Sequence, residues 1–396
     1  MEAERRPDPV GQLLRSRRLI VGSALLIVLL TLTVIATMRP ATNRAHSSRA
    51  ADSEPVRTNS SPAAQWQAAL DRHFAGNQAC RECHAEQFDA HARSGHSHTA
   101  TLMAESDLAR RLDGTSYRDP LTRDEFRFTL GDDAFVVSTG TGPTQQQLPV
   151  EWLLGSGQRA QTGVAITGTA GIEQRWTAFA PDGRLGVTPS HERLPKVQPG
   201  SPGCFGRPMT TGDVLSCLGC HMTFGPPRGA PMTREFFKPN IDCERCHGPR
   251  KAHVQAAHRG EAASVRPMVN LKDPQVEFAL CAQCHRASDQ VDHSLPEHEA
   301  VRFQPHRLQL SRCWQESAGQ LACAACHDPH DAVATDPAHY TQSCLTCHTA
   351  PQDTPCPVQP QGTCIDCHMP EVDWQSGITF RDHWIRIPDQ QSEGEN

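Results

Sequence analysis

The feature of this sequence that most constrains its fold is a short pattern, Cys-x-x-Cys-His, that occurs seven times. The copies use 14 of the 17 cysteines. Chance placement at these residue frequencies would give about 0.04 copies, so composition does not explain the pattern. The cysteines of the motifs are Cys80, Cys83, Cys217, Cys220, Cys243, Cys246, Cys281, Cys284, Cys323, Cys326, Cys344, Cys347, Cys364 and Cys367. The histidines that close them are His84, His221, His247, His285, His327, His348 and His368.

This spacing predicts covalent attachment of haem. Two thiols two residues apart reach the two vinyl groups of one haem, and the next histidine binds the iron through an imidazole nitrogen. We therefore predict seven haem c groups, with the motif cysteines as thioether attachment points and the motif histidines as proximal iron ligands.

Zinc is the main alternative. The gaps from Cys326 to Cys344 and from Cys347 to Cys364 enclose 17 and 16 residues, a spacing that zinc ribbons also use. A zinc ribbon does not require a histidine after each second cysteine, yet all seven motifs have one. A thioredoxin-like redox pair would not need seven copies, and no alternating strand and helix pattern surrounds them. The haem interpretation is favoured.

Composition agrees with a cofactor-filled interior. Only 37% of the residues are hydrophobic and 5% aromatic, a small supply for a core. Porphyrins would supply much of the apolar interior, so folding should depend on their insertion. The formal charge of -6 argues against nucleic-acid binding, which requires a basic excess.

A low-spin haem takes a second axial ligand, and other histidines can provide it. His330 follows His327 by three residues and cannot circle to the far face of the same haem, so we expect it to bind an adjacent one. For the N-terminal haem group, His91 and His98 compete with His96. The candidate distal ligands are His96, His191, His253, His306, His330 and His383. Six candidates leave at least one of seven haems without an assigned distal ligand.

The motifs, with "CHGPRKAH", "CHDPH" and the closing "CIDCHMP…FRDHWIR", resemble those of multihaem c-type cytochromes over roughly residues 77–388. That group includes tetrahaem carriers, pentahaem nitrite reductases and hydroxylamine oxidoreductases, and the resemblance implies haems stacked in pairs. The nitrite reductases bind their catalytic haem through Cys-x-x-Cys-Lys, which is not found here. Hydroxylamine oxidoreductases add a tyrosine link, and neither Tyr117 nor Tyr340 has a recognisable setting for it. Both departures favour an electron carrier.

The fold class that we predict is mainly α with little regular structure, a multihaem cytochrome fold built around haem pairs. A small β-rich subdomain is expected between the first and second motifs, because residues 124–142 and 162–191 alternate around turn sequences. It would pack over the first haems and bring His191 to an iron.

Three cysteines lie outside the motifs. In an oxidising compartment two of them would pair, and we expect Cys313 with Cys356, which leaves Cys204 unpaired. Other pairings stay open, because connectivity does not follow from sequence.

The N-terminus predicts a membrane anchor. Residues 19–38 contain no charge over 20 positions, enough to cross a bilayer, and arginines precede them. A cleaved signal peptide is the alternative. The anchor would place the haem domain in the periplasm or extracytoplasmic space, with the N-terminus inside. The predicted organisation is 1–18 basic N-terminus, 19–38 transmembrane signal-anchor, 39–64 disordered linker, 65–110 first haem-binding segment, 111–200 β-rich haem-free subdomain, 201–388 six-haem region and 389–396 disordered tail.

The predicted function is electron transfer along a chain of mostly bis-histidine haems. Expected partners are redox proteins, with a quinol-linked membrane donor and periplasmic cytochromes or reductases as acceptors, together with the cytoplasmic membrane. The alternative function is an oxidoreductase that acts on a small nitrogen or sulfur species at one five-coordinate haem.

Overall fold

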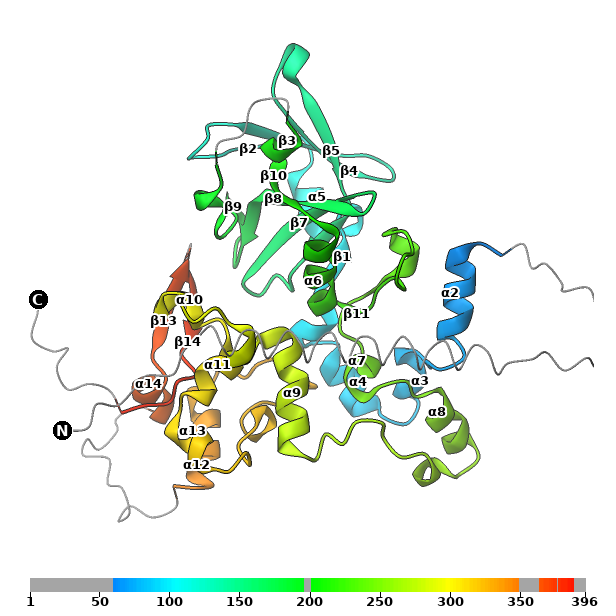
Figure 1. The fold of residues 1–396 in the computed structure, drawn as a ribbon, viewed down its shortest axis with the longest axis vertical. Helices are drawn as coiled ribbons and strands as arrows, with labels where there is room; N and C mark the ends of the chain where they lie inside the picture. Colours follow the sequence, from blue (N-terminus) through cyan, green and yellow to red (C-terminus); the bar gives the residue numbers. More distant parts are fainter. Residues whose placement is uncertain (1–59, 196–200, 349–362, 376, 388–396) are drawn as a thin grey trace, which may run out of the picture. The chain divides into compact units, whose positions relative to one another are not determined.

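The computed structural model describes residues 60–195, 201–348, 363–375 and 377–387 (Figure 1). The described helices are α2 (Pro62–Leu70), α3 (Asn77–Arg81), α4 (Ala85–His91), α5 (Asp107–Leu112), α6 (Thr211–His221), α7 (Cys243–His247), α8 (Lys251–His258), α9 (Pro274–His285), α10 (Glu297–Ala300), α11 (Gln304–Gln309), α12 (Arg312–Glu316), α13 (Pro337–Leu345) and α14 (Cys364–His368). Most of them are short.

The strands of the described residues form four antiparallel sheets. The largest contains β1 (Ala100–Leu102), β6 (Trp152–Leu154), β7 (Ala160–Thr167), β8 (Ala170–Phe179), β9 (Arg184–Val187) and β10 (Gly206–Met209). A second contains β2 (Ser116–Arg118), β3 (Glu125–Leu130), β4 (Phe135–Thr139) and β5 (Gln146–Val150). Two hairpin-like pairs are β11 (Met222–Phe224) with β12 (Lys238–Pro239), and β13 (Glu371–Gln375) with β14 (Ile378–Arg381).

The fold-class prediction of a mainly helical chain with little regular structure is wrong. The hairpin expected within residues 124–142 is present, because β3 pairs with β4. The six-stranded sheet, however, also takes β1 and β10 from outside the expected β-rich stretch. These strands have three and four residues, too few to show the alternation by which a strand is predicted from sequence.

The hydrophobic core of the described residues lies in and between these larger sheets. Alternate residues of β3 and β4 are fully buried, including Phe126, Phe128 and Phe135. Trp176 of β8 meets Phe128 edge to face, with 5.2 Å between the ring centres. The larger cluster of buried apolar side chains thus lies mainly between the first and second cysteine motifs.

The six-stranded sheet positions one motif directly. β10 is followed by Thr210, which starts α6 with a capping box in which its hydroxyl accepts from the Asp213 backbone N–H. Val214 and Leu218 bury one face of α6, and the helix ends at His221. The sheet, the cap and the apolar face therefore fix where the second motif lies.

The predicted membrane anchor is corrected. Residues 19–38 lie outside the described residues, and within the described part of the chain none of the helices combines the length and apolar character needed to cross a bilayer. The single-pass localisation with a periplasmic haem domain is therefore withdrawn.

Candidate haem centres

Each motif forms about one helical turn, so its two sulfurs lie on one face. Four motifs end at the last residue of a helix, namely of α6, α7, α9 and α14. In the other three, the backbone N–H of the histidine donates to the carbonyl of the first cysteine, at 2.9 Å for His84, 2.9 Å for His327 and 3.0 Å for His348. Residues three apart are neighbours on a helical turn, which is the geometry that two thioether bonds to one haem require.

Two proximal histidines have one ring nitrogen held by the backbone. Nδ1 of His221 lies 2.8 Å from the carbonyl oxygen of Thr99, and Nδ1 of His368 lies 2.8 Å from that of Arg386. With the proton on Nδ1, Nε2 carries the free lone pair, as in metal-binding histidines. Burial lowers the pKa of His221, which favours the neutral ring that a metal needs.

Three candidate distal histidines lie opposite proximal histidines of other motifs. The ring centres are 6.4 Å apart for His96 and His285, 6.0 Å for His247 and His330, and 6.1 Å for His327 and His383. Two imidazoles that share a metal about 2 Å from each ligating nitrogen have ring centres about 6 Å apart. The three pairs therefore have the spacing of two axial ligands on one iron.

The distal rings are also oriented through their second nitrogen. Nδ1 of His330 lies 3.2 Å from Oδ1 of Asp328, and Nδ1 of His383 lies 3.0 Å from the carbonyl oxygen of Arg381. His96 hydrogen-bonds to the backbone of Pro329. Such contacts fix the tautomer and leave one nitrogen for the metal. Burial lowers the pKa of His383 to about 4, so this ring is neutral at pH 7.

The remaining distal candidates stay predictions. Burial lowers the pKa of His253, and the charges of Arg250 and, more weakly, His84 lower it further. His84 therefore lies near the His253 ring. His306 faces His293 with 5.7 Å between ring centres, and its Nδ1 contacts Ser288.

His191 is buried in the β-rich part of the chain. Its Nε2 lies 3.1 Å from Oε2 of Glu173, and Arg207 also donates to that oxygen. This hydrogen bond occupies Nε2, whereas Nδ1 is buried without a partner among the described residues.

Motifs that are distant in sequence lie side by side. Buried Glu244, between the cysteines of the third motif, accepts from the backbone N–H groups of Ala75, Gly76 and Arg250, at 2.7–2.9 Å. The first two donors lead into α3 and the first motif, and Cys80 and Cys243 share a hydrogen bond. The Glu244 carboxylate thus holds the first and third motifs together.

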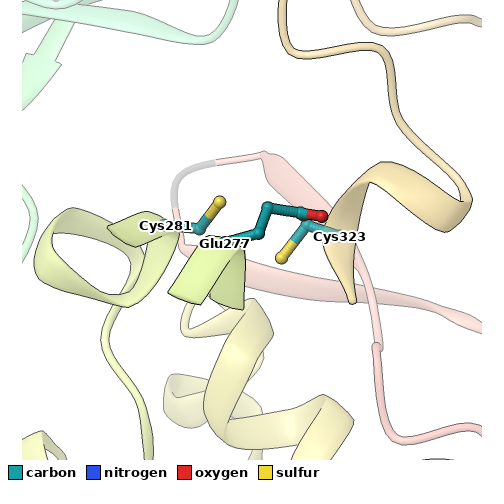
Figure 2. Close-up of side chains that lie close together, drawn as sticks. All are labelled: Glu277, Cys281 and Cys323. Carbon is teal, nitrogen blue, oxygen red and sulfur yellow. The ribbon is translucent and has the colours of Figure 1, made fainter. Parts of the chain in front are cut away.

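The fourth and fifth motifs meet at Glu277, Cys281 and Cys323, whose ligand atoms all lie within 4.8 Å of one another (Figure 2). The cluster offers three ligand atoms, one fewer than a structural zinc site takes. The backbone N–H of Ala324 already donates to Oε1 of Glu277, at 2.7 Å. Each cysteine also belongs to a complete Cys-x-x-Cys-His motif, so attachment points for two adjacent haems fit this arrangement better than zinc.

A cavity of about 440 Å³ lies between α6 and α9, beside Cys220. Arg245 and Arg286 line it, and Arg245 donates to Gln283 at 3.1 Å. Cationic side chains at this position suit the propionates of a neighbouring haem, since the propionates lie at the edge of a porphyrin opposite its thioether bonds. The residues present therefore fit haem.

The disulfide pairing of the three cysteines outside the motifs stays a prediction. Cys356 lies outside the described residues, so the expected pair with Cys313 is untested. Cys204 is half-buried, and its sulfur lies 3.6 Å from Oε1 of Gln146.

Several contributors to these centres were missed from the sequence. Asp328 stands between the motif and the second histidine of "CHDPH", a position that could have suggested a partner for His330. The carbonyls of Thr99, Arg381 and Arg386 carry no residue-type signal, since every residue has one.

Comparison with known proteins supports the haem interpretation. Residues 207–248 match the family model of cytochrome c554 and c-prime, a segment that contains the second and third motifs. Among solved structures, the outer cell wall cytochrome OcwA is similar, with 16% identity, a TM-score of 0.44 and coverage of 79% of each chain. No curated protein matches the chain by sequence. The family match supports a multihaem c-type cytochrome with covalently bound haem c.

Proposed function

We propose that the protein is a heptahaem c-type cytochrome that transfers electrons along a chain of haems, most of them with two histidine ligands. The observation that carries the proposal is the pairing of His285, His247 and His327 with histidines of other parts of the chain, at ring-centre distances of 6.0–6.4 Å. Haem c, when bound, supplies a one-electron iron couple whose potential depends on axial ligands, burial and hydrogen bonds.

The contacts between motifs support a continuous path. Glu244 joins the first and third motifs, and His330 of the "CHDPH" stretch faces His247 of the third. The fourth motif adjoins the fifth at Cys281 and Cys323, and it adjoins the second where the sulfur of Cys220 lies 3.9 Å from the carbonyl oxygen of Gln283. Neighbouring attachment points place neighbouring redox centres close together, as a carrier needs.

The sixth and seventh motifs continue the series. Cys344 and Cys364 are in hydrogen-bond contact, and His383, which follows the seventh motif, lies opposite His327 of the fifth. Backbone carbonyls, and the Asp328 carboxylate at His330, orient several of these imidazoles through one ring nitrogen. A ring fixed in this way need not reorganise when the charge of the centre changes.

Partners would be redox proteins with basic docking faces. The chain has a formal charge of -6, and haem propionates would add negative charge. Complementary charge raises the rate at which two proteins meet, and added salt reduces this gain because it screens the charges.

The test uses the purified holoprotein. We expect potentiometric titration to show reversible reduction in several overlapping one-electron steps that account for seven irons. Electron paramagnetic resonance of the ferric protein, with and without nitrite or hydroxylamine, is then expected to show low-spin signals that these compounds leave unchanged. A high-spin signal that shifts on their addition, together with their turnover, would instead establish the oxidoreductase alternative.

A further inference from the structure

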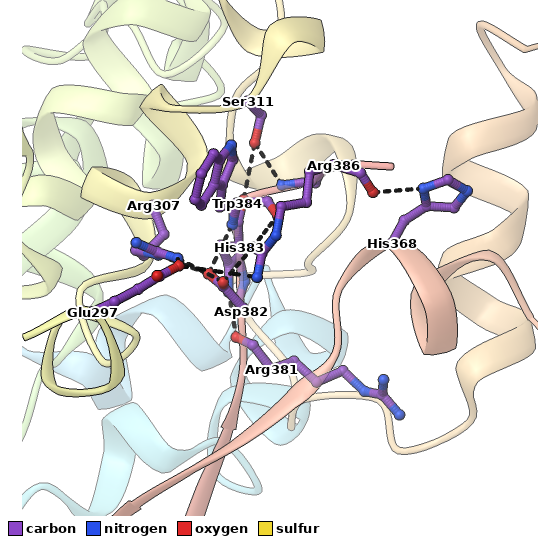
Figure 3. Close-up of polar contacts among 10 residues, drawn as sticks. Glu297, Arg307, Ser311, His368, Arg381, Asp382, His383, Trp384 and Arg386 are labelled. Carbon is purple, nitrogen blue, oxygen red and sulfur yellow. Dashed lines mark hydrogen bonds and ion pairs between the residues drawn. The ribbon is translucent and has the colours of Figure 1, made fainter. Parts of the chain in front are cut away.

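Residues 381–386, which we term the closing segment, contact two candidate haem centres at once. Figure 3 shows the contacts around Asp382 and the contact of Arg386 with His368. His383 lies opposite His327 of the fifth motif. The carbonyl oxygen of Arg386 lies 2.8 Å from Nδ1 of His368, the proximal histidine of the seventh motif. Any shift of this segment would therefore move a ligand of one iron and a hydrogen bond to a ligand of another.

The carboxylate of Asp382 is the centre of the contacts that hold this segment. Oδ1 accepts from Nε of Arg307 at 2.8 Å and from the Trp384 backbone N–H at 3.0 Å. Oδ2 accepts from Nη2 of Arg307 at 2.7 Å and from Nη1 of Arg386 at 2.6 Å. The side chain is 1% exposed, and the Arg307 side chain 4%. A two-pronged arginine contact to a buried carboxylate is both strong and directional.

The other contacts tie the same segment to α11 and its neighbours. The Ser311 hydroxyl donates to the carbonyl of His383 at 3.1 Å and accepts from the Ile385 backbone N–H at 2.7 Å. The guanidinium groups of Arg307 and Arg386 both lie over the Trp384 ring, 5.1 Å and 4.5 Å from its centre. The backbone on both sides of His383 is thus fixed by groups outside the segment.

We propose that Asp382 is a positioning residue that sets His383 as the axial ligand facing His327 and, through Arg386, fixes the hydrogen bond on His368. The inference rests on the proposed function, since it takes these histidines as iron ligands. Replacing one carboxylate oxygen by an amide turns an acceptor into a donor that points at arginine donors. Asp382→Asn therefore releases the closing segment without changing the volume of the side chain.

The experiment compares four variants of the full-length holoprotein by electron paramagnetic resonance, with and without imidazole. His383→Ala gives the signal of an iron that has lost this ligand. In Asp382→Asn we expect part of that high-spin signal, and added imidazole should abolish it. Potentiometric titration of the same variant should show a shifted reduction potential for the haem of the seventh motif, which His368 would bind. Loss of one charge-assisted hydrogen bond should increase the fraction of protein molecules in which His383 is dissociated from iron by about tenfold over the wild type.

The matched control is Glu297→Gln. Glu297 contacts the same Arg307 Nη2 at 2.7 Å and lies 4.0 Å from Nη2 of Arg386, but its side chain is 59% exposed, so solvent screens both contacts and Asp382 keeps its own hydrogen bonds when Glu297 is changed. We expect its spectrum to equal that of the wild type. Arg307→Lys keeps the positive charge but loses the two-pronged contact with Asp382. If Asp382→Asn gives no holoprotein, the spectrum of Arg307→Lys tests the positioning role.

The outcomes separate the two levels of the argument. If His383→Ala produces no high-spin signal, the ligand assignment of the proposed function fails, and this inference with it. If His383→Ala does so but both Asp382→Asn and Arg307→Lys keep the wild-type spectrum, only the positioning role is overturned.

Discussion

Removal of the His330 imidazole should change one haem and leave the others as they are. The ring faces His247 of the third motif at 6.0 Å between ring centres, whereas its own neighbour His327 faces His383. In His330→Ala the haem of the third motif keeps its thioether bonds and His247 but loses its sixth ligand. One iron in seven should then change from low-spin to high-spin.

The fold should tolerate this change. The His330 side chain is 39% exposed, so its truncation leaves no buried apolar cavity. The haem of the third motif would keep its two thioether bonds and His247, so haem content should match the wild type. Electron paramagnetic resonance, with the spin count referred to total iron, measures the fraction.

His258→Ala is the control, because that side chain is 62% exposed and its contact, at 3.7 Å, is to the exposed carboxylate of Glu82 in the first motif, whereas His330 lies opposite the ring of His247. Added imidazole should restore the low-spin state of His330→Ala and leave His258→Ala unchanged. A wild-type spectrum for His330→Ala, or a high-spin signal of equal size in the control, would refute the assignment of His330 to an adjacent haem.

Three further predictions concern stability. Glu244→Gln should lower the free energy of unfolding by about 1–3 kcal/mol, because the backbone N–H groups that it accepts from lose a charged acceptor. Denaturant titration measures this difference, and an unchanged midpoint would contradict the role of Glu244 in joining the first and third motifs. Gly206→Ala should cost about 3 kcal/mol in the same assay, since φ is 149° and a Cβ would lie 2.0 Å from the Glu173 carbonyl oxygen; an unchanged midpoint would contradict the register of β10. Burial alone would raise the pKa of Glu173, but hydrogen bonds from His191 and Arg207 lower it overall. Its stabilising contribution is thus fully present above the unfolded pKa of about 4.3 and is lost as the pH falls from there through the lower folded-state pKa, so Glu173→Gln should flatten that acidic part of the stability curve.

The chemistry of the motifs could be predicted from the sequence in more detail than the fold. Spacing alone predicted the attachment points, because thioether bonding depends on residues three apart on one turn. The argument that His330 serves another haem needed only the three-residue separation from His327, and the structure places it opposite His247. These are local constraints, and local constraints are visible in sequence.

Long-range arrangement was less accessible. His96 was expected to serve the N-terminal haem group, whereas the structure places it opposite His285 of the fourth motif. The expectation of His191 at an iron stays a prediction; in the structure its Nε2 contacts Glu173 of β8 at 3.1 Å. Both residues lie in short 3-10 turns, Gly95–His98 and His191–Arg193, and contact residues that are distant in the sequence, which local sequence patterns do not reveal.

The central claim is that all seven motifs carry haem. Intact mass of the purified protein under denaturing conditions tests it most directly, because only covalently bound haem stays with the chain. We predict a mass equal to the polypeptide plus seven haems, and loss of one haem for each variant in which both cysteines of a motif are replaced by alanine. A mass with fewer than seven haems, or a colourless protein that contains zinc, would contradict the account.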